Sequence, residues 1–451
     1  MSRYLRVSFI CLIFAWFKKY AMWHHVPFSA LCFDQQDSRA KLRAPLSLPQ
    51  TVGRACVVFL FLWLLVLGPP TVLADGPALE HKAQQTPPIL LGATGSNIVV
   101  EPLCNVGTLG SLVEDQDGDL YILSNTHVLA GVNEGTIGAT NPPGDDIQHA
   151  GALDSGIFPE VCNNFANNGG LGVYVVGNLW DYVPLVNIES SDEGIVDAAI
   201  AKVADCEVNG KEVSCVNTAG QILDVGLINP NVVANPTVGM KVKKSGRTTG
   251  LTRGEIFDTD AAILVDYGPF SSLYEHQLAI VGTEPVDAFS DNGDSGSLVV
   301  LDEPYYARSR PVGLLFAGKG QDFMDGGSAD LTIAHPITDV LDAFANGDTE
   351  SGDEYDLEFV SEAGRPSRPD RDRKPDPQLA PAIKVEKKYG KFLLSLPEVV
   401  GYGIGRSNRE GGNVVIHVYL KRGTPEALRA LPASLDGVPV QHLVTGRFVA
   451  H

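Results

Sequence analysis

Asn292-Gly293-Asp294-Ser295-Gly296-Ser297 is the stretch that decides the fold of this chain. A serine hydroxyl is a poor nucleophile at neutral pH, so it needs an imidazole to take its proton and a carboxylate to hold that imidazole in one tautomer. The sequence offers both upstream: His127 ends Ser124-Asn125-Thr126-His127, and Asp197 begins the run Asp197-Ala198-Ala199-Ile200. These residue types predict a catalytic triad of His127, Asp197 and Ser295.

The composition indicates a folded, acidic protein. The chain has 451 residues, of which 44% are hydrophobic, with 47 glycines and 29 prolines. That is enough for two or three domains with buried cores. The formal net charge is −20. Binding to nucleic acid or to an anionic membrane surface relies on clustered Lys and Arg, so this charge argues against both kinds of partner.

An export signal is predicted at residues 52–74. Arg54 precedes an apolar run from Ala55 to Leu67, and the small-residue pattern Val72-Leu73-Ala74 follows before Asp75. The run is short for a membrane span, which favours a cleaved signal peptide over the alternative of an uncleaved anchor. We therefore expect a secreted or periplasmic protein with no stable membrane insertion. Residues 1–51 are interpreted as a gene-model extension or a disordered segment.

Cysteine usage agrees with export. Three of the seven cysteines precede the expected cleavage site, which leaves Cys104, Cys162, Cys206 and Cys215. An Asn-Gly turn lies between Cys206 and Cys215 among alternating residues, which places their sulfurs across a hairpin. We predict disulfides Cys206–Cys215 and Cys104–Cys162, with reduced thiols as the alternative.

Residues 88–346 read as short β-strands separated by Gly, Asn, Asp and Pro. Gly107–Val113 and Leu120–Ser124 flank an acidic turn and predict a hairpin that delivers His127. Further strands are expected at Gly172–Val176, Ala198–Val203, Gly239–Lys243, Ala262–Val265, Gln277–Val281, Ser297–Val300 and Val312–Phe316. So many strands without intervening helices indicate an all-β double barrel or sandwich.

Four ordered motifs resemble the bacterial branch of chymotrypsin-like serine proteases, streptogrisin-like enzymes included. They are Asn125-Thr126-His127-Val128-Leu129, Asp197-Ala198-Ala199-Ile200-Ala201, Lys244-Ser245-Gly246-Arg247-Thr248-Thr249-Gly250-Leu251 and Asn292–Ser297. The chain order His, Asp, Ser is also theirs, and differs from that of subtilisins and α/β-hydrolases. The resemblance implies an all-β double β-barrel (chymotrypsin-like) with the triad in the cleft between the barrels, and endopeptidase activity over residues 88–346.

The resemblance also implies a role for each site residue. Ser295 would attack the scissile carbonyl, His127 would act as general base and then general acid, and Asp197 would orient the imidazole. The backbone N–H groups of Gly293 and Ser295 would form the oxyanion hole. Asp192 and Asp205 lie near Asp197 in sequence, but only Asp197 directly precedes an apolar strand as the motif requires.

Asp294 is expected to be buried beside the oxyanion hole, and a buried carboxylate needs a partner. The bacterial relatives are similar to this chain in offering a basic residue at the Ser-Gly-x-Thr-Thr-Gly motif. Lys244 and Arg247 are therefore the candidates for a buried ion pair with Asp294. The alternative is that both basic side chains are solvated.

The primary specificity pocket is implied to lie among Phe289, Asp291, Phe316 and Gly318. The chain departs there from the common Ser-Trp-Gly pattern, having Phe316-Ala317-Gly318. Phe289 and Phe316 would shrink the pocket and favour small or apolar side chains, whereas Asp291 would attract a basic one. Both alternatives stay open.

Two regions follow the expected protease domain. Residues 347–381 are acidic, then rich in Pro, Arg and Asp, and are interpreted as a flexible linker. Residues 382–451 are interpreted as a small C-terminal α/β domain, with a helix at Val385–Leu396, strands at Val414–Leu420 and Val438–Leu443, and a short helix capped by Thr424. Through intramolecular contact it either inhibits the protease domain or assists the folding of that domain. The alternative is that it serves as a binding or packing module.

The sequence thus favours a secreted serine endopeptidase that acts on protein or peptide substrates through an acyl-enzyme. The alternative is a catalytically silent protein with a protease fold that binds a partner. No metal or organic cofactor is implied.

Overall fold

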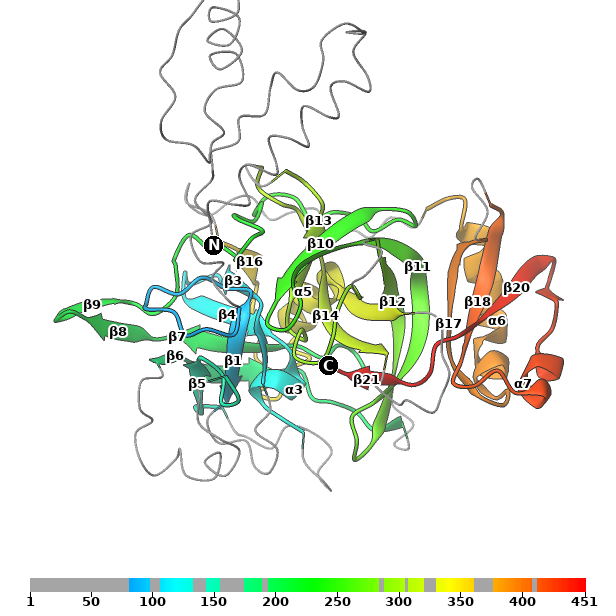
Figure 1. The fold of residues 1–451 in the computed structure, drawn as a ribbon, viewed down its shortest axis with the longest axis horizontal. Coiled ribbons are helices and arrows are strands. Elements are labelled where there is room, and N and C mark those ends of the chain that lie inside the picture. The colour runs from blue at the N-terminus through cyan, green and yellow to red at the C-terminus, as the bar shows by residue number, and fades with distance from the viewer. Residues whose placement is uncertain are drawn as a thin grey trace, which may run out of the picture. The chain divides into compact units, whose positions relative to one another are not determined.

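Two large β-sheets contain most of the strands in the described part of the chain (Figure 1). The computed structural model describes residues 81–97, 106–132, 143–154, 174–188, 194–283, 288–304, 307–319, 330–360, 376–407 and 412–451. The predicted signal peptide, the segment before it, Cys104 and Cys162 lie outside the described residues. Within these ranges, no helix is long and apolar enough to cross a membrane.

The first sheet runs in the order β16-β3-β4-β7-β6-β5-β1-β2. Its strands are β1 (Ala93–Asn97), β2 (Gly107–Leu109), β3 (Ser111–Glu114), β4 (Leu120–Ser124), β5 (Asp146–His149), β6 (Tyr174–Tyr182), β7 (Ala199–Val203) and β16 (Glu358–Phe359). Only Gly110 separates β2 from β3, so one stretch pairs with β1 at one end and with β4 at the other. A Cβ at Gly110 would lie 1.9 Å from the carbonyl oxygen of Gly296, so only glycine lets this stretch approach the Ser295 turn.

The second sheet contains strands that pair in a closed circuit. They are β10 (Lys241–Gly246), β11 (Gly250–Asp266), β12 (Ser271–Gly282), β13 (Leu298–Leu301), β14 (Pro311–Lys319) and β15 (Leu331–Pro336). The circuit closes because β10 pairs with β11 on one side and with β13 on the other. Apart from Lys319, every residue of β14 is buried, which fits its nearly continuous apolar sequence.

Two short elements follow directly from local sequence. The helix α3 (Thr126–Leu129) begins directly after β4 and carries His127. The hairpin of β8 (Asp205–Val208) and β9 (Lys211–Ser214) turns at Asn209 and Gly210, which both have positive φ as this turn type requires. Cys206 and Cys215 form a disulfide across the hairpin, with Cα atoms 5.0 Å apart.

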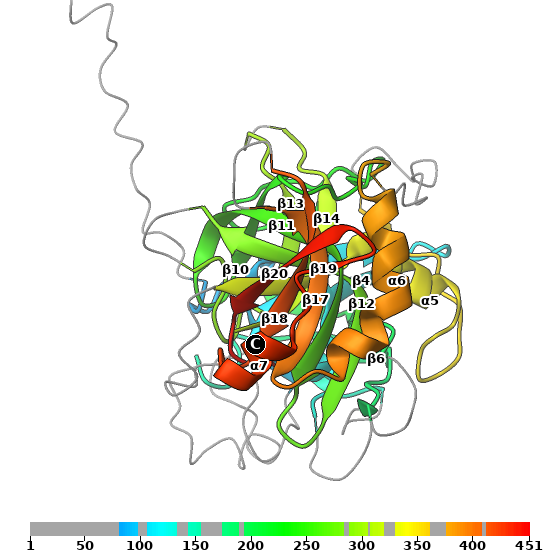
Figure 2. The same ribbon diagram turned by 90° about the vertical axis from the view of Figure 1, so that its right-hand side faces the viewer.

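The C-terminal region extends the second sheet. Its elements are α6 (Ala380–Leu394), β17 (Val399–Arg406), β18 (Val414–Leu420), α7 (Pro425–Ala430), β19 (Ser434–Leu435), β20 (Val438–Val444) and β21 (Phe448–Ala450). β17 pairs with β11, and α6 packs on β17 and β18 (Figure 2). The hydroxyl oxygen of Thr424 accepts from the N–H of Ala427 at 3.2 Å, as its predicted capping role requires.

A buried polar cluster joins this region to β11. The carboxylate of Asp258 on β11 contacts His417 Nδ1 at 2.7 Å and accepts a hydrogen bond from the hydroxyl of Tyr419, both on β18. Gly405 opposes Asp258 in the register between β17 and β11, and a Cβ there would meet the Asp258 carboxylate. The C-terminal strands and the second sheet therefore share a continuous interior.

The segment 347–381 differs from the expected linker in its first part. Leu357 and Phe359 are buried, and β16 pairs with β3. The reason is that Tyr355, Leu357 and Phe359 alternate with acidic residues, so one side of this segment is apolar and packs on the first sheet. The helix α5 (Ile337–Ala345) precedes it and packs against β14 and β15.

Candidate active site

The side chains of His127 and Asp197 meet at the C-terminal end of β4 and the N-terminal end of β7. His127 Nδ1 lies 2.5 Å from Asp197 Oδ2, and the backbone N–H of His127 donates to Asp197 Oδ1 at 3.2 Å. Both side chains are buried. The amide of Asn125 also donates to the Asp197 carbonyl oxygen at 2.6 Å, which fixes the turn before α3 against β7.

Asp205, one of the two alternatives to Asp197, does not contact His127. Asp205 is exposed on β8, in the disulfide-linked hairpin, and Asp192 lies outside the described residues. Of the two described aspartates, Asp197 is the one that contacts His127.

Asp197 is held as a carboxylate by several groups. The hydroxyl of Tyr267 donates to Asp197 Oδ2 at 2.8 Å, and the backbone N–H of Asp197 donates to His335 Nε2 at 2.9 Å. Complete burial by itself would raise the pKa of Asp197, but the neighbouring His127 and these contacts outweigh it and lower that pKa. The site therefore favours a charged Asp197 next to the imidazole.

Sequence reasoning missed both Tyr267 and His335. His335 lies in the apolar strand β15, and its ring stacks on Phe316 with centroids 3.7 Å apart. Burial lowers its pKa to about 3, so it accepts from Asp197 as a neutral imidazole. A histidine inside the mainly apolar run Leu331–Pro336 is a signal in the sequence for a buried polar contact. Tyr267 lies in a turn between β11 and β12, and no sequence pattern marks it.

Ser295 lies in a tight turn between two glycines with positive φ, Gly293 at 95° and Gly296 at 91°. A Cβ at Gly293 would lie 2.5 Å from Arg247 Nη1, so the turn requires glycine for space as well as for conformation. The Ser295 hydroxyl donates to the carbonyl oxygen of Phe316 on β14 at 2.9 Å.

Asp294 pairs with Lys244, one of the two basic candidates. Lys244 Nζ lies 3.2 Å from Asp294 Oδ2, and neither side chain is exposed. The hydroxyl of Thr249 and the N–H of Thr248 also donate to this carboxylate, at 2.7 and 2.8 Å. Burial raises the pKa of Asp294, but Lys244 and these donors outweigh it and hold the pKa below its usual value.

Arg247 has a different partner. Its guanidinium donates to both carboxylate oxygens of Asp154, at 2.6 and 2.7 Å. Because Asp154 follows β5 and Arg247 follows β10, this two-point ion pair ties the first sheet to the second. Neither basic residue is simply solvated.

The four residues predicted for the specificity pocket have separate environments. Phe289 belongs to the apolar core with Ile256 and Leu315, and Phe316 is buried against His335. Gly318 lies against the ring of His451. The carboxylate of Asp291 accepts from the N–H of Asn292 at 2.8 Å, within the turn before Ser295.

The main chain of residue 451 is linked to both the predicted base, His127, and the predicted nucleophile, Ser295. Its carbonyl oxygen lies 3.3 Å from His127 Nε2. Its N–H donates to the Phe316 carbonyl oxygen at 3.2 Å, which is also the acceptor of the Ser295 hydroxyl. His451 thus contacts His127 directly and shares the Phe316 carbonyl oxygen with Ser295.

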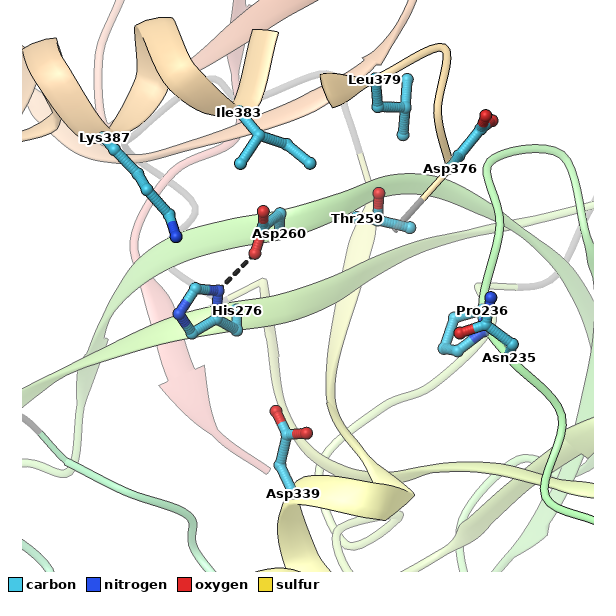
Figure 3. A pocket seen from close by; sticks show the side chains of 10 residues that line it. All are labelled: Asn235, Pro236, Thr259, Asp260, His276, Asp339, Asp376, Leu379, Ile383 and Lys387. Atoms are coloured by element: carbon cyan, nitrogen blue, oxygen red, sulfur yellow. Dashed lines mark hydrogen bonds and ion pairs between the residues drawn. The ribbon is translucent and has the colours of Figure 1, made fainter. Parts of the chain in front are cut away.

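A separate cavity of about 410 Å³ opens between β11, β12 and α6 (Figure 3). Its lining includes His276 and Asp260, which contact one another, and Lys387 from α6. No residue of the predicted triad lines it. Among the described residues, no group of three or more His, Cys, Asp or Glu side chains is arranged to hold a metal ion.

Comparison with known proteins gives a partial match. A family model described as the Nal1 C-terminal domain matches residues 174–327. The chain is 24% identical over 214 residues to Protein NARROW LEAF 1 of Oryza sativa subsp. japonica, a match that covers 47% of this chain. It covers 34% of that protein, so the chain spans about a third of the length of this curated relative.

Two of the solved structures similar to this chain are proteases. One is a serine protease specific for glutamic acid that uses a histidine triad in substrate binding; it is 18% identical, with a TM-score of 0.33, and covers 60% of this chain and 100% of its own. Nocardiopsis protease is 13% identical, with a TM-score of 0.31, and covers 60% and 99%. Likenesses this loose decide nothing about activity.

Proposed function

We propose that this protein is a serine endopeptidase in which Ser295, His127 and Asp197 form the catalytic triad. The observation that carries the proposal is the buried 2.5 Å contact between His127 Nδ1 and Asp197 Oδ2. The other ring nitrogen of His127 lies 3.3 Å from the carbonyl oxygen of His451, and the N–H of His451 shares the Phe316 carbonyl oxygen with the Ser295 hydroxyl. Acyl transfer to serine requires a base that is oriented by a carboxylate and whose other ring nitrogen can take the proton of the serine hydroxyl.

The reaction would follow from this arrangement. The Ser295 hydroxyl rotates from the Phe316 carbonyl toward His127 Nε2, which takes its proton as Oγ bonds to the scissile carbonyl carbon. The C–N bond then breaks, and the leaving amine takes the proton from Nε2. Water attacks the acyl-enzyme by the same route, giving its proton to His127 and releasing the acid and Ser295.

The turn around Ser295 suits the stabilisation of an oxyanion. We infer that the N–H groups of Gly293 and Ser295 bind the developing negative charge, where removal of one such donor costs roughly 3 kcal/mol of barrier. The Asp294–Lys244 pair anchors this turn to β10. Because Lys244 already satisfies Asp294, no newly liberated α-amino group is needed to form this pair.

The two sheets support the same proposal. We infer that they correspond to the two barrels of the chymotrypsin-like fold, since α3 carries His127 at the end of the first sheet, and the Ser295 turn precedes β13 of the second. The motif around Lys244 and Arg247 is the basis for placing the chain near the bacterial branch of that family.

One observation favours the alternative, a catalytically silent binding protein. In the structure the Ser295 hydroxyl donates a hydrogen bond to the Phe316 carbonyl oxygen, and His451 of the same chain contacts His127. A binding protein would keep this arrangement, whereas a protease must release it before substrate binds.

Secretion is part of the proposal and rests on residues 52–74. N-terminal sequencing of the protein recovered outside the cytoplasm should give a chain that begins at Asp75. Peptides from residues 1–50 in that product would contradict the interpretation of this segment as a gene-model extension.

Labelling by a fluorophosphonate probe tests the catalytic role. The full chain should be labelled at Ser295, and Ser295→Ala and His127→Ala should abolish labelling. Ser297→Ala is the matched control, because Ser297 lies in the same turn and donates to the Asp294 carbonyl oxygen. Labelling of the Ser295→Ala variant, or none in any chain with Ser295 and His127 intact, would reject the proposed triad.

A further inference from the structure

The last strand described, β21, pairs with β14 on one side and in parallel with β11 on the other (Figure 1). β21 is antiparallel to β14, with Ala450 opposite Ala317 and Val449 opposite Gly318. The N–H of His451 continues the pairing by donating to the Phe316 carbonyl oxygen. Pairing of an extended segment with the strands of a sheet is a common way to bind a peptide.

The C-terminal end of β21 leads to the proposed catalytic residues. The carbonyl oxygen of His451 lies 3.3 Å from His127 Nε2. In a peptide bound the same way, the bond after the residue at this position would lie beside His127 and Ser295. Residues 448–451 therefore occupy the place of the four residues that precede a scissile bond.

The His451 side chain is held by a chain of polar contacts. Its Nε2 lies 3.4 Å from the carbonyl oxygen of Lys319, and its Nδ1 lies 3.4 Å from Ser290 Oγ, which is 2.6 Å from Thr332 Oγ1. A carbonyl only accepts, so Nε2 carries the hydrogen and Nδ1 accepts from Ser290, which in turn accepts from Thr332. Burial lowers the pKa of His451, which agrees with a neutral ring in this network.

The shape of the pocket fits a flat ring. A Cβ at Gly318 would lie 2.1 Å from Cε1 of His451, so the imidazole packs directly on the glycine backbone. Three positions earlier, Phe448 is buried with its ring edge-on to Tyr419, the centroids 5.8 Å apart. Tyr419 belongs to β18, so the C-terminal region forms part of this apolar subsite.

We propose that the cleft selects peptides with histidine immediately before the scissile bond and an apolar aromatic residue three positions earlier, and that residues 448–451 compete for that cleft. That a bond is cleaved after the histidine rests on the proposed function, but the selective binding of the peptide does not. Ser290, Thr332 and Gly318 are then the specificity-determining residues, and the chain's own Phe448-Val449-Ala450-His451 is a model of the substrate.

Peptide binding tests the inference without catalysis. The probes are fluorescein-labelled Phe-Val-Ala-X-Gly-Gly, with X as His, Ala, Phe, Glu or Lys, bound to the full chain carrying Ser295→Ala and His451→Gly. We expect the His peptide to bind about tenfold tighter than each of the others, because only it completes both hydrogen bonds. Another peptide binding more tightly, or all five binding within about threefold, would overturn the selectivity.

Competition is measured in the same assay with His451 restored. The full chain carrying Ser295→Ala alone should bind the His peptide at least about tenfold more weakly, since the tail occupies the pocket. Equal binding by the two chains would show that the His451 side chain does not compete for the pocket.

The pocket residues are tested by adding Ser290→Ala and Thr332→Val to the two-substitution chain. The His peptide should lose about tenfold in affinity while the Ala peptide is unchanged. Ser271→Ala on β12 is the control and should change neither. Equal losses for both peptides would contradict recognition of the imidazole. Labelling of Ser295 without any preference for histidine would reject this inference alone, whereas absent labelling with retained His selectivity would reject only the proposed catalysis.

Discussion

Tyr267 donates a hydrogen bond to Asp197 Oδ2, the carboxylate oxygen that also lies 2.5 Å from His127. Tyr267 is buried, and its hydroxyl oxygen lies 2.8 Å from that of Tyr274 on β12. Burial and the adjacent Asp197 charge raise the pKa of Tyr267 well above its usual value, so it stays a donor. A residue in the turn between β11 and β12 of the second sheet therefore fixes the carboxylate that precedes β7 of the first.

Tyr267→Phe should slow labelling of Ser295 about tenfold while the protein stays folded. The substitution removes one hydrogen bond to a charged group, which is worth about 1.5–3 kcal/mol at most, and leaves the ring in place. Rates of fluorophosphonate labelling measure the effect. Tyr174→Phe, on the half-buried start of β6, is the control. An unchanged rate in Tyr267→Phe would mean that Asp197 is held well enough by its other partners.

Asp197→Asn should lower the labelling rate on the order of 10³–10⁴-fold, because an amide in place of the carboxylate favours the wrong tautomer of His127. The thermal unfolding midpoint should change far less than the rate. Asp205→Asn, an exposed aspartate in β8, should leave labelling unaffected. A labelling rate near that of the parent chain would exclude Asp197 from the proposed triad.

Lys244→Met should destabilise the protein by about 3–5 kcal/mol, since it leaves the buried Asp294 carboxylate without its cation. Lys241→Met is a matched control on the same strand, where the exposed pair with Glu255 is worth less than about 1 kcal/mol. Urea unfolding gives both values.

The same pair predicts a pH dependence. The native pKa of Asp294 is lowered, so the stability that its charge confers is present at neutral pH and is lost as pH falls through that native pKa. The gap between Lys244→Met and the parent chain should therefore narrow in acid, where Asp294 is protonated. A gap that widens in acid would contradict the charged pair.

Glu386 on α6 predicts the opposite slope. Burial, then Asp260 and Glu275, raise the pKa of its carboxyl from 4.5 to about 7, although Tyr402 and His276 oppose this. The native state therefore holds this proton more tightly than the unfolded chain, and the contribution of Glu386 to stability falls as pH rises from about 5 to above 7.

Glu386→Gln should remove that slope and raise the unfolding midpoint at pH 8 by a few degrees. Thermal scans at pH 5.5 and 8 measure it, with the exposed Glu212→Gln as the control. If the midpoint of Glu386→Gln falls as steeply between these pH values as that of the parent chain, Glu386 is not the group responsible.

Local sequence determined the elements of this protein. Alternating and continuous apolar runs predicted strands at β4, β14 and β18. They could do so because the pattern of buried side chains along a strand is visible in the local sequence. The Asn209-Gly210 turn predicted the hairpin that joins Cys206 to Cys215, since positive φ is cheap for these residue types. The motifs around His127, Asp197 and Ser295 singled out the site residues.

The tertiary structure alone decided which side chains meet. Lys244 rather than Arg247 pairs with Asp294, and Tyr267 reaches Asp197, because the packing of segments that are far apart in the chain brings these side chains together. The return of His451 to β14 is the extreme case, since its contact with His127 spans 324 residues. A local pattern records which side of an element is buried, but long-range pairing determines what that side is buried against, and the selectivity proposed for the cleft depends on that pairing.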